Sequence, residues 1–218
     1  MNTYLATAVS ALTLAVAAPA FATITVISSP PFPQNPPENV LLTSGSTGAT
    51  LTGTTNQTNT SVAFTSSTDT LVSPPQGQAF LAATDNTLGN LNIALTNKNL
   101  GFTSFEFNIN SPTTQNVTLV FTDQFGQTQV ADGGTTTFSI GANGSNFINA
   151  LATNGEFITN VSLTGANLTS VGQVRLGGVA AFRAVPEPTT WAMLIVGFGG
   201  VGALMRSRRR GGRAPAAA

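Results

Sequence analysis

The feature that most constrains the fold is a two-residue alternation of apolar and other side chains, repeated along the middle of the chain. In one run Phe105, Phe107 and Ile109 share a face, while Glu106 lies on the opposite one. Such alternation is typical of strands with one buried face, and clusters of Asn, Asp and Gly separate the runs as turns. We predict a mainly β, antiparallel domain of the sandwich or jelly-roll-like class. The further alternating runs lie at 117–121, 138–140, 157–163 and 174–182.

Other segments carry weaker patterns. Residues 30–37 are rich in Pro and indicate an extended leader along the surface. Residues 43–70 are rich in Thr, Ser, Gly and Asn, which favours one or two edge strands or a loose loop. Residues 147–151 suggest a short helical turn. The predicted division is a signal peptide at 1–22, a Pro-rich leader at 23–39, an exported β-sandwich domain at 40–184, a sorting segment at 185–210 and a disordered tail at 211–218.

Composition excludes several classes of function. The formal net charge is zero, but between residues 23 and 184 acidic side chains outnumber basic ones by seven to three. Nucleic-acid binding needs a basic surface, so no nucleic-acid partner is expected. The chain has no Cys, which excludes disulfides and thiol catalysis. It also has no His, which removes the Ser-His-Asp triad and the usual catalytic zinc sites.

Paired carboxylates are the remaining route to catalysis. Glu106 and Glu156 both fall in expected strands and would need to converge, as in glycoside hydrolases. The simpler interpretation is two solvated side chains that face outward. We therefore predict a protein that is not an enzyme and needs no cofactor.

A structural calcium ion is the open alternative among ligands. Asp85, Asp123 and Asp132 occur in expected turns beside Asn, Gln or Gly. Hard cations favour such oxygen donors. Asp also occurs in turns for its backbone geometry alone, so these three are weak candidates.

Sugar binding has a partial argument against it. Sugars usually stack on Trp or Tyr, but Tyr4 and Trp191 both lie in the terminal segments. A stacking site is therefore disfavoured, while shallow polar binding stays open.

The N-terminus predicts export. Residues 5–18 are apolar, and Ala20 and Ala22 give the small-x-small pattern of a signal-peptidase site, with cleavage before Thr23. Signal peptidase is the expected partner. The alternative is an uncleaved N-terminal membrane helix, since no Lys or Arg precedes the apolar run.

The C-terminus combines three signals in a fixed order. A Pro-Glu-Pro sequence precedes Trp191 and Ala192, and an apolar run at 191–205 leads into a basic cluster. A 15-residue helix spans roughly 22 Å at ~1.5 Å per residue, against a hydrocarbon core of about 30 Å. Contact with membrane lipid through a temporary transmembrane segment is expected, with the cluster in the cytoplasm. A plain membrane anchor is the alternative. The signal residues are Pro186, Glu187, Pro188, Arg206, Arg208, Arg209 and Arg210.

These elements and their spacing resemble the PEP-CTERM sorting signal, in its PEPxxWA variant. Proteins with this signal are exported by Gram-negative bacteria that often make exopolysaccharide. The resemblance implies that exosortase recognises Pro186, Glu187 and Pro188 as a substrate motif and removes the tail. It also implies a cell-surface or extracellular-matrix protein associated with exopolysaccharide or biofilm. The alternative is a membrane-anchored binding module for calcium or glycans.

Overall fold

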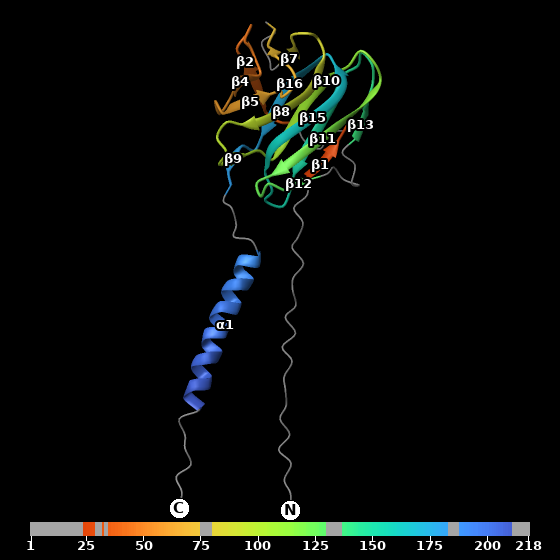
Figure 1. The fold of residues 1–218 in the computed structure, drawn as a ribbon. Coiled ribbons are helices and arrows are strands. Elements are labelled where there is room, and N and C mark those ends of the chain that lie inside the picture. The colour runs from red at the N-terminus through yellow and green to blue at the C-terminus, as the bar shows by residue number, and fades with distance from the viewer. Residues whose placement is uncertain are drawn as a thin grey trace, which may run out of the picture.

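The computed structural model describes residues 24–28, 32, 35–74, 80–129, 137–182 and 188–210. It contains a curled β domain and one helix, α1 (Pro188–Arg210) (Figure 1). Each strand pairing in the described part is antiparallel. The prediction of a mainly β, antiparallel domain is therefore confirmed.

Most strands join one hydrogen-bonded sheet with a main path of eleven strands. The first part of the path is β1 (Ile24–Ile27), β14 (Asn146–Ala152), β10 (Ser104–Asn110), β16 (Ser170–Gly177) and β2 (Glu38–Leu42). The second part is β4 (Thr50–Thr55), β5 (Ser61–Thr65), β8 (Leu88–Leu95), β15 (Ile158–Leu168), β11 (Gln115–Asp123) and β12 (Thr128–Gln129). Shorter strands branch from it or pair beside it: β3 (Thr47–Gly48), β6 (Leu71–Val72), β7 (Phe80–Ala83), β13 (Thr137–Ile140), β9 (Leu100–Gly101) and β17 (Ala180–Ala181).

Strand β2 links the two parts of the path. Glu38 and Asn39 pair with β16, whereas residues 40–42 pair with β4. The strands therefore form a single curled sheet, like half of a barrel, where the sequence pattern suggested two packed sheets (Figure 1). This link depends on pairings between segments far apart in the chain, so local alternation does not reveal it.

The core follows the predicted alternation. On β11, Val117, Leu119 and Phe121 are buried, and the residues between them are partly exposed. Phe105 on β10 packs against Phe107, with ring centroids 5.0 Å apart and planes tilted by 47°. A fully buried Phe contributes about 1.5–3 kcal/mol, so these rings are a main source of stability. One side of the curled sheet, to which these residues point, therefore holds the core.

Two predictions of local structure are wrong. The segment expected as a helical turn is strand β14, because it pairs with both β1 and β10 and buries Ile148 and Ala150. The segment at 43–70 forms more than edge strands: the short β3 has β6 as its one strand partner among the described strands, but β4 and β5 lie inside the main path and bury Leu51, Val62 and Phe64. Thr on the exposed face hid this alternation, since Thr is polar but favours strands.

The last predicted strand is two separate strands. β16 ends at Gly177, and Gly178 has a φ of +63°, a left-handed conformation that Gly adopts without steric cost. The short β17 then pairs with β9 in a two-stranded sheet of its own.

The two ends of the chain carry the predicted export and sorting segments. The predicted signal peptide lies outside the described residues, and Ile24–Ile27 of the predicted leader form β1. Helix α1 covers the predicted apolar run, with Met193 and Phe198 exposed by 77% and 72%. In the described part of the chain, no helix has both the length and the apolar character needed to cross a membrane.

Candidate functional site

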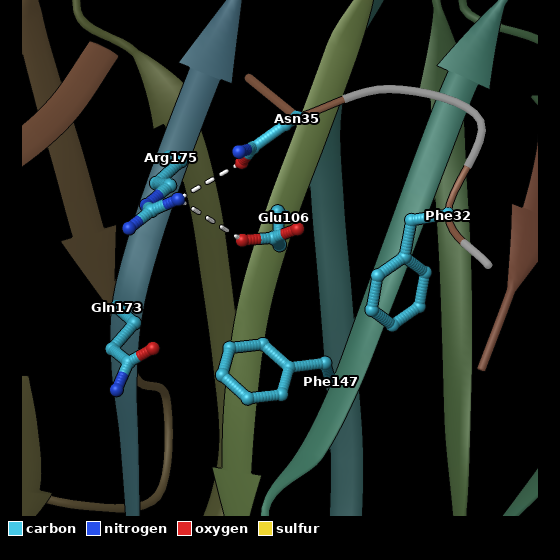
Figure 2. Close-up of a pocket in the computed structure, with 6 residues that line it drawn as sticks. All are labelled: Phe32, Asn35, Glu106, Phe147, Gln173 and Arg175. Carbon is cyan, nitrogen blue, oxygen red and sulfur yellow. Dashed lines mark hydrogen bonds and ion pairs between the residues drawn. The ribbon is translucent and has the colours of Figure 1, made fainter. Parts of the chain in front are cut away.

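Strand β10 is buried on both of its faces. Ser104, Glu106 and Asn108 point away from the core, yet they are only 3%, 6% and 7% exposed. An antiparallel sheet with one solvated face would leave such residues in water. Here Phe32 and Asn35, between β1 and β2, lie over this face of the sheet (Figure 2). Both residues belong to the predicted Pro-rich leader, of which residues 29–31, 33 and 34 lie outside the described residues.

An open cavity of about 390 Å³, the outer cavity, lies on this covered face. Its floor and walls come from β10, β14, β16 and the segment before β2 (Figure 2). The lining residues are Phe32, Asn35, Glu106, Phe147, Gln173 and Arg175.

The register of three strands brings the polar lining together. Glu106 on β10 lies opposite Asn149 on β14 and Arg175 on β16. Arg175 Nη1 is 3.7 Å from Glu106 Oε1, and Asn149 Nδ2 donates to Glu106 Oε2 at 3.4 Å. Arg175 also donates through Nε to Asn39 Oδ1 at 3.0 Å and through Nη1 to Asn35 Oδ1 at 2.9 Å. The guanidinium therefore fixes the covering segment to the sheet.

A β-bulge shapes the wall beside Arg175. Between Glu106 and Asn108 the register with β16 shifts, so that two β16 residues stand opposite one residue of β10. Gln173, in this bulge, has a φ of +53°. A residue other than Gly in this region costs on the order of 1–3 kcal/mol, and bulges often re-aim a side chain. The result is that Gln173 lines the outer cavity (Figure 2).

Two phenylalanines form the opposite wall. The ring centroids of Phe32 and Phe147 are 6.4 Å apart, with planes tilted by 59°. Both side chains are half-buried and lie across Glu106 from Gln173 and Arg175 (Figure 2). Sequence reasoning missed this wall because it assigned Phe147 to a helical turn. The outward positions of β14 include the apolar Phe147 and Leu151, so no alternation of apolar and polar residues marks this strand in the sequence.

The two glutamates considered for catalysis have different surroundings. Glu106 lines the outer cavity, whereas Glu156 lies in the turn before β15 and is 1% exposed. Both were expected as solvated side chains in strands. The expectation of solvated side chains is wrong for both, since both are buried. The strand position is right for Glu106, on β10, and wrong for Glu156.

Glu156 forms a pair with Asp123. Burial, then the negative charge of Asp123 and a hydrogen bond with its side chain, raise the pKa of Glu156 to about 7. Asp123 Oδ1 accepts the N–H groups of Phe125 and Gln127, both at 2.8 Å. The contact between the two carboxyl groups joins the end of β11 to the loop before β15.

The calcium candidates are separated or engaged in turns. Asp85 Oδ1 accepts the N–H of Thr87 at 3.0 Å. Asp123 Oδ1 accepts the N–H groups of the turn that follows it. Asp132 lies outside the described residues. Among the residues that the structure describes, no three His, Cys, Asp or Glu side chains are grouped to hold a metal ion. Calcium binding stays the alternative to the predicted absence of a cofactor.

The sorting segment begins at the end of the β domain. Pro188 is the first residue of α1, a position that suits Pro because its missing N–H has no partner there. Trp191, Ala192 and the arginines Arg206, Arg208, Arg209 and Arg210 also lie in α1. The residues Pro186, Glu187, Ala20, Ala22 and Thr23 lie outside the described part of the chain.

Comparison with known proteins identifies this segment. The family model of the PEP-CTERM protein-sorting motif matches residues 184–210. The predicted resemblance is confirmed, and the motif supports an exported protein that exosortase sorts. No curated protein and no solved structure matches the chain.

Proposed function

We propose that this chain is a cell-surface or extracellular-matrix protein whose tail exosortase removes after export. The observation that carries the proposal is the sorting motif at residues 184–210. Its position supports processing, because the described β domain ends at Phe182 and α1 begins at Pro188. A cut near residues 186–188 would remove α1 without breaking a paired strand.

Brief membrane contact fits the character of α1. Ile195, Val196 and Phe198 are each more than 60% exposed, so the helix offers apolar side chains that a lipid surface would cover. Four glycines between residues 197 and 202 weaken the helix. We therefore propose a temporary membrane contact during processing, followed by transfer to the surface or release.

Removal of the signal peptide is the matching step at the other end. Cleavage before Thr23 would start the mature chain one residue ahead of β1. Ile24 is 1% exposed and pairs with Ala152, so the fold uses the chain almost from that cut.

A non-enzymatic role in an exopolysaccharide or biofilm matrix is the proposal for the mature domain. It comes from the family resemblance and agrees with the outward face of the second part of the sheet. There Thr50 lies opposite Thr65, with their Oγ1 atoms 3.2 Å apart, and Thr65 lies opposite Asn92. Uncharged hydroxyl and amide groups of this kind suit contact with hydrated neutral polymers.

Intact mass and C-terminal peptide mapping of the native protein test the sorting proposal. Membrane and culture-supernatant fractions are measured separately. The expected species runs from Thr23 to a terminus near residues 186–188. A membrane species that retains Arg206 through Arg210 would reject exosortase processing. A deletion strain with unchanged matrix and aggregation would reject the matrix role.

A further inference from the structure

The sorting role uses none of the residues that line the outer cavity. The cavity has an aromatic wall, Phe32 and Phe147, and a polar wall, Arg175 and Gln173, on either side of Glu106 (Figure 2). Its volume of about 390 Å³ lies within the range of roughly 300–1,000 Å³ that is usual for small-molecule sites.

The polar groups of this face retain unused hydrogen-bonding capacity. Glu106 is 6% exposed, but its contact to Arg175 is 3.7 Å and its hydrogen bond from Asn149 is 3.4 Å. Both are longer than a strong charge-assisted bond of ~2.8 Å, and a carboxylate offers about four acceptor positions. On the same face of β10, Asn108 Oδ1 is buried without a hydrogen-bond partner in the described residues. A ligand with O–H donors would supply what the Glu106 carboxylate lacks.

The charges restrict the ligand further. One carboxylate and one guanidinium face the cavity. A free cation would be attracted by Glu106 but repelled by Arg175, and a free anion would be attracted by Arg175 but repelled by Glu106. A neutral molecule with both donors and acceptors satisfies each group. The aromatic wall additionally requires an apolar face about as wide as a ring.

We propose that the outer cavity binds a neutral sugar unit. The ring C–H face would pack on Phe32 and Phe147, while hydroxyl groups donate to Glu106 and accept from the Gln173 amide and Arg175. Phe supplies an apolar face but lacks the hydrogen-bonding O–H of Tyr or N–H of Trp. The polar wall of the cavity would supply the hydrogen bonds instead. The positive φ of Gln173 is unfavourable for a residue other than Gly, and strained residues of this kind are common at binding sites. Here the strained conformation places the Gln173 side chain at the cavity.

This inference deepens the proposed matrix association and rests on it for the biological setting alone. Binding is measured on the purified protein, so its failure would leave the sorting proposal standing, and a failure of sorting would leave the binding result unchanged.

Saturation-transfer NMR with the full chain in detergent micelles tests the proposal. The probes are glucose, galactose, mannose, maltotriose and cellotriose, with free lysine as a charged comparison. We expect saturation of the ring C–H protons of at least one sugar. No transfer to any of these sugars would overturn the proposal, and transfer to lysine alone would overturn the ligand class.

Three variants locate the binding. Gln173→Gly removes the amide and relieves the positive φ, so its unfolding temperature should match or exceed that of the wild type. Gln173→Gly and Phe147→Ala should each weaken binding roughly three- to tenfold, the effect of losing one buried contact. Phe125→Ala is the matched control, because Phe125 is 47% exposed in the turn after β11 and does not line the cavity. Unchanged affinity in both cavity variants would overturn the assignment.

Discussion

Replacing Glu156 by Gln should remove a loss of stability that the wild-type protein shows as the pH rises from 4.5 to 7. Glu156 is buried beside Asp123, and its pKa is raised from 4.5 to about 7. Between these values the folded protein holds a proton that the unfolded chain has released. Unfolding then releases a proton, so the free energy of unfolding falls with rising pH across this window and levels off above pH 7.

The structure sets the size of the effect. The interval from 4.5 to about 7 corresponds to about 3 kcal/mol, at ~1.4 kcal/mol for each pH unit. The full loss requires that the ionised Glu156 stays against Asp123, and rotation of either side chain into water would reduce it. Gln mimics the protonated acid, since its amide can donate to the Asp123 carboxylate and carries no charge.

Urea unfolding of the full chain, followed by circular dichroism from pH 4.5 to 8, measures this difference. The wild type should lose stability between pH 4.5 and 7, and Glu156→Gln should show a nearly flat profile there. Asp85→Asn is the control, because Asp85 is an exposed turn carboxylate and the change should leave the wild-type slope in place. A flat wild-type profile, or the same slope in Glu156→Gln, would refute the reasoning.

Three further predictions concern acid stability, packing and metal binding. Burial acts to raise the pKa of Glu38, but hydrogen bonds from Thr58 and neighbouring groups outweigh it and lower the pKa below 4.5. The ionised Glu38 therefore stabilises the fold, and this stabilisation is lost as the pH falls through the lowered pKa. Thr58→Val removes the 2.7 Å bond from Oγ1 and should make the acid loss shallower in a titration followed by circular dichroism. Gly101→Ala should destabilise the domain by about 1–3 kcal/mol in urea unfolding, because the new Cβ would lie 2.6 Å from Phe157 Cβ; Gly144→Ala, with only an ordinary contact at 3.7 Å, should leave stability unchanged. Calcium should leave the unfolding temperature unchanged, because the described turn carboxylates already accept backbone N–H groups; a concentration-dependent rise would contradict this.

The strands that sequence reasoning predicted are those in which apolar and polar residue types alternate clearly. In β10 and β11 large apolar residues alternate with polar ones, so Phe107 and Leu119 identify the core face directly. In β4 the exposed positions are Thr and the buried ones include Gly53, so the contrast between the faces is weak. Gly53 fits because a Cβ there would lie 2.8 Å from the backbone oxygen of Leu41, a constraint set by a strand eleven residues or more away in the sequence.

The outer cavity was beyond prediction for a related reason. Its lining comes from residues 32, 35, 106, 147, 173 and 175, which are far apart in the sequence and are brought together by strand register. The bulge at Gln173 carries no signal of its own, since Gln is not a residue that favours positive φ. The sorting motif is the opposite case, because a processing enzyme reads a short continuous segment and the spacing of residues is visible in the sequence itself.

The sorting motif and the outer cavity lie on separate parts of the chain. The described lining of the outer cavity lies between Phe32 and Arg175, so a cut near residues 186–188 leaves that lining on the mature chain. The sugar affinity of the uncleaved protein and of the cleaved protein should therefore agree within about twofold, a difference below 0.5 kcal/mol. If the affinity instead appeared only after cleavage, α1 or the segment before it would have to cover the cavity, and the tail would act on ligand binding as well as on sorting.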